Sequence, residues 1–225
     1  MCNENTMNKT WYLILFVFGI SACTQNNKLM NAKVLTYTTN VEILNDSFSQ
    51  SVIDYFSQKY GDSVEVTYDS RGNIRMDYFG SGDMGMSYNF YNARLHQNYS
   101  KSKNLDTIYF YDTSINNYRL DSTERISNEH GFILKYYSQD PYDSTGIIQE
   151  FHFLYDSLIV NPELYKDFND FSFCEIIADS KCLPIKTIVT NGGIRITRNL
   201  FRTRPIVNPN LSFFEPEKGI ELIAD

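Results

Sequence analysis

The chain has 225 residues and a formal net charge of −7 at pH 7, and 15% of its residues are aromatic. Its length is sufficient for one domain with a substantial core. The acidic balance argues against nucleic acid, and against a polybasic patch for binding membranes. The many tyrosine, phenylalanine and β-branched residues favour strands over helices.

The first 22 residues have the organisation of a lipoprotein signal peptide. Residues 11–20 carry no charge, but they are fewer than the roughly 20 apolar residues that a spanning helix needs. The run Ile20-Ser21-Ala22-Cys23 follows and resembles a bacterial lipobox, where a diacylglycerol is attached to the cysteine. An ordinary signal peptide with an incidental cysteine is the alternative. Translation starts at either Met1 or Met7, and Met7 would give the more ordinary leader.

Lipidation of Cys23 would anchor the mature protein, because each buried CH₂ group contributes about 0.8 kcal/mol to membrane binding. The polar residues after Cys23, up to residue 32, predict a short flexible tether. In Gram-negative bacteria, an Asp directly after the cysteine retains a lipoprotein at the inner membrane. The residue here is Thr24, so we expect the outer membrane. The absence of an acidic cluster after Cys23 favours its periplasmic face, with surface exposure left open.

Residues 33–225 are expected to form a single, mainly β domain of antiparallel strands, because strand patterns recur along their whole length and Asp-Ser and Asn-Gly-Gly turns separate them. The predicted strands are 34–44, 64–68, 74–79, 84–91, 105–111, 117–120, 132–137, 147–155, 171–177, 183–190, 194–201 and 219–223. Residues 50–60 predict one amphipathic helix that ends at Gly61, and residues 162–168 predict one further helical turn. This balance predicts a curved sheet whose concave face is partly covered by the helix.

Several strands carry apolar or aromatic residues on both faces, whereas an antiparallel sheet with one wet face should alternate. Tyrosines that tolerate solvent on the outer face would explain this pattern. The alternative is an inner face that lines an apolar cavity. For that cavity we select four bulky residues within strands: Phe110, Phe132, Phe151 and Phe153.

Cys174 and Cys182 are the two cysteines left after Cys23 in the mature chain. A hairpin centred on Ala178 would place them opposite each other, at a separation that a disulfide can bridge. Either they form this disulfide or they are two small buried thiols. A metal site is not expected, since no histidine or further cysteine lies nearby.

The C-terminal part resembles the outer-membrane lipoprotein carrier (LolA/LolB-like) superfamily and its uncharacterised periplasmic lipoproteins. The resemblance rests on a strand that begins at Leu183-Pro184, and on Phe214-Glu215-Pro216-Glu217-Lys218-Gly219-Ile220 before the last strand. It implies a strongly curved, unclosed β-barrel (a half-barrel) with one or two short helices on its concave side, over a cavity that holds acyl chains. The carrier's early basic-plus-proline strand motif is absent, so no transport residue is carried over.

No motif of enzyme chemistry is present. His96, His130 and His152 are isolated, and the chain has no nucleophile elbow, metalloprotease helix or phosphate-binding loop. We therefore expect no catalytic residue, metal or cofactor. The expected function is an anchored, non-enzymatic lipoprotein that binds a lipid or other hydrophobic ligand. The second expectation is a partner-binding or structural subunit of a cell-envelope complex, with a tyrosine-rich outer face as its interface. An enzyme with a dispersed site is the third.

Overall fold

A single sheet of 12 strands dominates the computed structural model, which describes residues 32–44, 48–113, 119–139, 146–206 and 211–224. The strands lie in the order β12-β6-β5-β4-β3-β2-β1-β11-β10-β9-β8-β7. Their bounds are β1 Ala32–Ile43, β2 Ser63–Tyr68, β3 Ile74–Phe79, β4 Met86–Asn92, β5 Gln97–Ser102, β6 Thr107–Asp112, β7 Arg119–Ser127, β8 Gly131–Gln139, β9 Gly146–Leu154, β10 Lys186–Asn191, β11 Ile194–Ile206 and β12 Glu221–Ala224.

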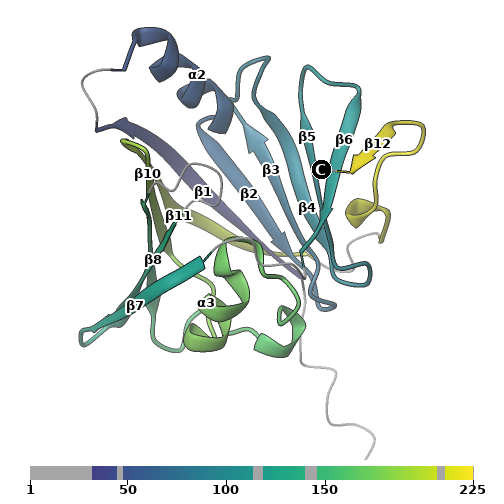
Figure 1. Cartoon of the computed structure of the whole chain (residues 1–225). Coiled ribbons are helices and arrows are strands. Elements are labelled where there is room, and N and C mark those ends of the chain that lie inside the picture. Colours follow the sequence, from purple (N-terminus) through teal and green to yellow (C-terminus); the bar gives the residue numbers. More distant parts are fainter. Residues whose placement is uncertain (1–31, 45–47, 114–118, 140–145, 207–210, 225) are drawn as a thin grey trace, which may run out of the picture.

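The sheet curves into an open half-barrel, as predicted (Figure 1). Strand β1 is at its centre and pairs with β2 on one side and with β11 on the other. All neighbouring pairs are antiparallel except β12 with β6, which is parallel. The two ends of the strand order, β12 and β7, do not pair with each other, so the barrel is not closed.

Two α-helices accompany the sheet in the described ranges: α2 Gln50–Tyr60 and α3 Phe173–Ser180. Helix α2 has the predicted bounds and ends at Gly61, whose φ of 68° lies in the left-handed region. Figure 1 shows α2 at one end of the strands, and α3 at the other end inside the curve. The short 3₁₀ helices are η1 Pro162–Leu164, η2 Asp170–Ser172 and η3 Leu211–Phe214.

The prediction of a strand over residues 171–177 is wrong, because η2 and α3 occupy this segment. The apolar residues Phe173, Ile176 and Ile177 suit a helical face as well as a strand, since their spacing is compatible with both periods. Strand β5 was not predicted at all, and β7 runs to Ser127, well beyond the predicted residue 120. Both strands are rich in polar residues, which hides the period-2 pattern.

The segment between β9 and β10 fills the α3 end of the concave face with side chains. Ile177 of α3 is fully buried in a cluster with Leu35, Val64 and Tyr165, while the adjacent Ile176 belongs to a second cluster around Phe132. Consecutive residues of one short helix thus connect the cores of the two walls of the half-barrel. One wall contains β1, β2 and β3, and the other contains β8 and β9. Because core burial supplies most of the stability of such a sheet, α3 holds the half-barrel in its curve.

The convex face has an apolar cluster of its own over β4, β5 and β6. Tyr88, Phe90, Tyr99 and Ile108 are buried there, and the rings of Phe90 and Tyr99 stack with centroids 4.7 Å apart. The C-terminal segment covers this cluster through Ile220 and η3. These strands therefore carry apolar residues on both faces because the concave core covers one face and the C-terminal segment covers the other. Exposed tyrosines do not explain the pattern.

Candidate functional site

The four phenylalanines selected from the sequence do not lie together. Phe132 and Phe153 are stacked at 5.0 Å and buried with Ile176, and Phe151 packs partly buried against the same cluster. Phe110 belongs to the convex cluster at the other side of the sheet. Three of the four thus share one core region on the concave face, where α3 already fills the space beside them.

A different part of the concave face carries apolar residues that belong to none of the three packed clusters. It lies at the α2 end of the central strands β1, β11, β10 and β9. We call it the apolar patch, and it consists of Val41, Ile43, Ile147, Val189, Ile194 and Ile196. Four of these side chains are only partly buried, so the patch is incompletely covered.

Helix α2, which contacts β1, has an incompletely covered apolar face as well. Val52, Ile53 and Phe56 lie on this face as the sequence predicts, yet no residue of α2 is fully buried. These three side chains are only partly buried, so the contact with β1 covers the apolar stripe incompletely. Two half-covered apolar surfaces therefore lie at the same end of the half-barrel.

Polar side-chain atoms without partners surround the apolar patch. Four such atoms on the concave face are buried and have no hydrogen-bond partner in the described structure: Thr39 Oγ1, Ser138 Oγ, Gln149 Oε1 and Arg198 Nε. Buried polar atoms are almost always hydrogen-bonded in folded proteins, so each of these lacks something that a bound molecule or water could supply.

Arg198 is the one residue of this group that carries a charge. Its guanidinium carbon lies 5.7 Å from the centroid of the Tyr78 ring, on the concave face. Burial raises the pKa of Tyr37 and of Tyr78, and the positive charge of Arg198 opposes both shifts. Arg198 thus gives the concave face a positive charge next to neutral tyrosines.

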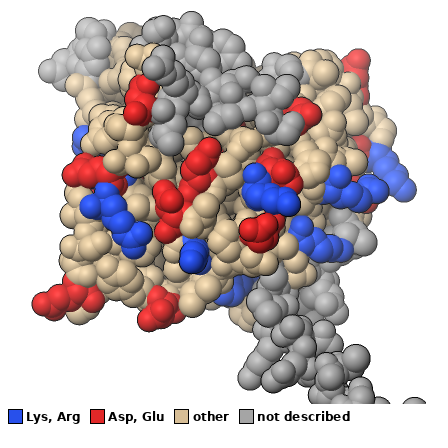
Figure 2. All heavy atoms as spheres, turned by 60° about the horizontal axis from the view of Figure 1, so that its bottom comes forward, with Lys and Arg blue, Asp and Glu red and all other residues tan. Residues whose placement is uncertain are grey.

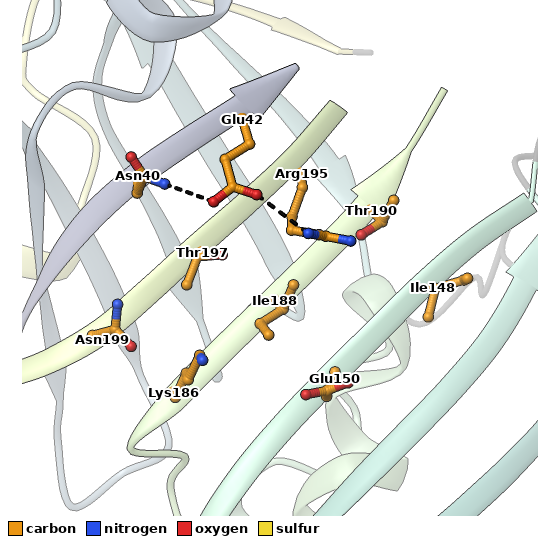
Figure 3. A pocket seen from close by; sticks show the side chains of 10 residues that line it. All are labelled: Asn40, Glu42, Ile148, Glu150, Lys186, Ile188, Thr190, Arg195, Thr197 and Asn199. Atoms are coloured by element: carbon orange, nitrogen blue, oxygen red, sulfur yellow. Dashed lines mark hydrogen bonds and ion pairs between the residues drawn. The ribbon is translucent and has the colours of Figure 1, made fainter. Parts of the chain in front are cut away.

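A hollow of about 500 Å³ lies on the convex face and crosses β1, β11, β10 and β9 (Figure 3). Its walls are mainly polar: Asn40, Glu42, Ile148, Glu150, Lys186, Ile188, Thr190, Arg195, Thr197 and Asn199. These side chains alternate along each strand with those that face α3 or the apolar patch, so we call this hollow the outer trough.

The charges of the outer trough are largely paired with each other. Glu42 accepts from Asn40 and Arg195, each at 3.2 Å, as Figure 3 shows. Glu150 contacts His152 at 2.5 Å and Lys135 at 3.5 Å. This arrangement explains His152, which the sequence left isolated: it is held by a carboxylate two residues before it on the same strand. The trough is a mixed-charge surface without a dominant sign.

Figure 2 views the end of the molecule where α3 lies, and basic and acidic side chains are interspersed over it. Among the described residues, no group of three or more His, Cys, Asp and Glu side chains has the arrangement of a metal site. No described helix is both long and apolar enough to cross a bilayer.

The two cysteines of the β domain are free thiols in this structure, and the geometry predicted for their disulfide is wrong. The predicted hairpin does not form because Cys174 lies in α3. Its Sγ contacts Asn169 Oδ1 and Glu175 Oε2, while Cys182 is buried next to Phe132. Cys23, the predicted lipidation site, and its tether lie outside the described residues, apart from Ala32.

No protein-family model matches the chain, and no curated protein matches its sequence. Solved structures of similar shape include an uncharacterised conserved protein from Thermus thermophilus, with 9% identity and a TM-score of 0.43 over 88% of this chain and 92% of that one. PNGF-II gives 10% identity and a TM-score of 0.44, over 87% of this chain and 32% of the other. The Mycobacterium tuberculosis lipoprotein LppX gives 9% identity and a TM-score of 0.32, over 89% and 98%. At such scores, no functional argument rests on these similarities.

Proposed function

We propose that this chain is a non-enzymatic lipoprotein, anchored through Cys23 to the periplasmic face of the outer membrane, and that it binds a lipid or other hydrophobic ligand on its concave face. The observation that carries the ligand proposal is the apolar patch. It is partly covered, it lies at the same end of the strands as the partly covered helix α2, and buried polar atoms without partners surround it. Ligand sites are commonly apolar with a few polar groups that fix orientation, and this surface has that composition.

The proposed site differs from the one expected from the sequence. The phenylalanines around Phe132 pack against α3, so we propose the α2 end of the strands for the ligand instead. There Val41 of β1 lies directly opposite Ile196 of β11, and Val189 of β10 is opposite Ile196 on its other side. These three side chains form a continuous apolar row across the centre of the half-barrel.

A matched pair of variants on β1 tests the ligand site. The full chain with Cys23→Ser, which removes the anchor's own acyl chains, would be titrated with a fluorescent fatty-acid probe. Val41→Trp fills the space over the patch and should abolish saturable binding. Thr38→Trp adds the same bulk on the exposed opposite face of the same strand and should leave binding unchanged. Failure of the parent chain to bind any apolar probe would reject the ligand proposal.

The anchor is tested separately, by feeding a Gram-negative host an alkyne-labelled palmitate. Wild type should incorporate the label and appear with the outer membrane after gradient fractionation, and Cys23→Ser should lose both properties. Cys2→Ser is the matched control, because Cys2 precedes the proposed cleavage site. Equal labelling of the wild type and of Cys23→Ser would contradict lipidation at this residue.

Partner binding at the outer trough is the second candidate function. Its support is the hollowed convex face, on which Ile148 is 42% exposed and Lys186 has no ion pair with any described residue. The tyrosine-rich interface expected from the sequence is not the reason, since eight tyrosines are buried. A photo-crosslinker at position 188 should give one discrete envelope adduct, and the same crosslinker at exposed Phe201 should not. Identical adduct patterns at both positions would reject this function.

A further inference from the structure

We propose that the ligand on the concave face is an anionic amphiphile, whose carboxylate or phosphate is held by Arg198 and Thr39 while its acyl chain lies on the apolar patch. This inference rests on the proposed function and adds the chemical class of the ligand and the position of its head group.

The two polar residues are neighbours across the central strand pair. Thr39 of β1 is directly opposite Arg198 of β11, and both side chains are on the concave face. Each has a buried polar atom without a partner, Oγ1 of Thr39 and Nε of Arg198. Directly opposed side chains have Cβ atoms about 4.5–5.5 Å apart. One carboxylate can therefore accept hydrogen bonds from both.

The other arginines of β11 show that Arg198 is unusual. Arg195 pairs with Glu42 at 3.2 Å, and Arg204 pairs with Glu65 at 2.9 Å, both on the convex face. Arg202 also lies near Glu65, at 3.7 Å. Arg198 forms a hydrogen bond with Tyr78, but it forms no ion pair with any carboxylate of the described residues. A partly buried guanidinium without a counter-ion is unfavourable, and its planar donor fork matches a carboxylate or phosphate.

Asp170, an acid on the concave side, forms no ion pair with Arg198. Asp170 interacts with Tyr111 and Asn98, and burial raises its pKa while only the hydrogen bond from Tyr111 lowers it. The site for an external anion at Arg198 is therefore not occupied by Asp170.

The apolar surface begins one row beyond the two polar residues. Val41 and Ile196 are opposite each other two residues along from Thr39 and Arg198, and Ile43 and Ile194 form the next row. At about 3.3–3.4 Å per residue, the strands extend about 13 Å from Arg198 to Ile194. Head-group donors at one end and an apolar surface at the other match an amphiphile, and not a purely apolar molecule.

The test compares two ligands that differ only in the head group, palmitic acid and 1-hexadecanol. Each would compete with the fluorescent probe on the full chain carrying Cys23→Ser. The parent should prefer the acid by about tenfold or more, the range expected for hydrogen bonds to a charged group. Arg198→Gln should remove this preference without weakening binding of the alcohol. Arg202→Gln, a matched arginine on the opposite face, should retain the preference.

The outcomes separate the inference from the function on which it rests. Equal affinities for acid and alcohol in the parent, unchanged in Arg198→Gln, would overturn the head-group assignment and leave the ligand site standing. Binding of neither compound would overturn both. If far-UV circular dichroism shows that Arg198→Gln is unfolded, Thr39→Val tests the head-group assignment instead. It should weaken only the acid, and an equal effect on both ligands would overturn the assignment.

Discussion

Asn92 donates a hydrogen bond from its Nδ2 to the carbonyl oxygen of Phe214, at 3.1 Å, and both residues are buried. Its Oδ1 accepts from the backbone N–H groups of Arg94 and Leu95, so the same side chain also shapes the turn after β4. One amide thus connects a hairpin turn to a segment 122 residues later in the sequence. The C-terminal segment is held on the convex face by this bond and by the donation from Arg75 to the carbonyl of Phe213.

Asn92→Ala should therefore lower the free energy of unfolding by about 1–3 kcal/mol, because it leaves buried backbone groups without partners. Urea unfolding followed by circular dichroism measures this loss. Asn104→Ala, which removes an exposed amide, should stay within about 0.5 kcal/mol of wild type. Equal stability of the two variants would show that the bond to Phe214 does not hold the C-terminal segment.

Ile177→Ala should be among the most destabilising substitutions, at about 2–5 kcal/mol, because Ile177 is fully buried between α3 and the sheet. The control is Ile159→Ala, since Ile159 is 60% exposed and should tolerate truncation. Thermal and urea unfolding of both variants would give the comparison. A loss below about 1 kcal/mol for Ile177→Ala would contradict the role of α3 in connecting the two walls.

Stability should fall as the pH rises through the titration of Asp170. Burial raises the pKa of this carboxyl from 3.8 to about 6, against the hydrogen bond from Tyr111. Below about pH 4 the group is protonated in both states. Between about pH 4 and 6 the unfolded chain loses the proton first, so the folded state loses stability, and the loss is complete above about pH 6.

Asp170→Asn should remove this pH dependence. Its free energy of unfolding should exceed that of the wild type by up to roughly 3 kcal/mol between about pH 4 and pH 7. Urea unfolding at several pH values across this interval measures the difference. Asp106→Asn, at an exposed position, should follow the wild-type profile. If the Asp170→Asn profile ran parallel to that of the wild type, the buried carboxyl would not be the titrating group.

Both thiols of the β domain should react slowly in the native protein. Burial and the neighbouring Glu175 raise the pKa of Cys174 to about 12, and burial also raises the pKa of Cys182. Since the thiolate is the nucleophile, iodoacetamide at about pH 8 should label neither residue appreciably before unfolding, and both fully afterwards. Peptide mass spectrometry resolves the two sites. A peptide pair joined through Cys174 and Cys182 would contradict the free thiols seen here.

The parts of the fold that sequence reasoning predicted are those set by local patterns. The bounds of α2 follow from its apolar spacing and from Gly61, and the turn at Gly192-Gly193 follows from residues that accept positive φ. The helical state of residues 173–180 was missed because the deciding contacts of Ile176 and Ile177 come from distant strands. Tertiary packing overrides local propensity at such positions.

The residues selected from the sequence for a cavity are not those of the proposed site. Bulky phenylalanines indicated an apolar interior, yet Phe132 and Phe153 fill a core, and the patch is built from smaller β-branched residues such as Val41 and Ile196. Nothing in the sequence distinguishes Arg198 from Arg202, because only the register of β1 and β11 and the bulge near Tyr37 decide which faces inward. The outer trough depends on the same register across four strands.

Synthesis proceeds from the N-terminus, so Phe90 and Tyr99 are synthesised well before the C-terminal segment that covers their rings. A chain that stops before η3 would display this stacked surface to water and to other unfinished chains, which is the usual route to aggregation. The covering segment around η3 and Ile220 is therefore synthesised after the surface that it covers. Forms truncated before η3 should aggregate even if every strand before β12 is folded.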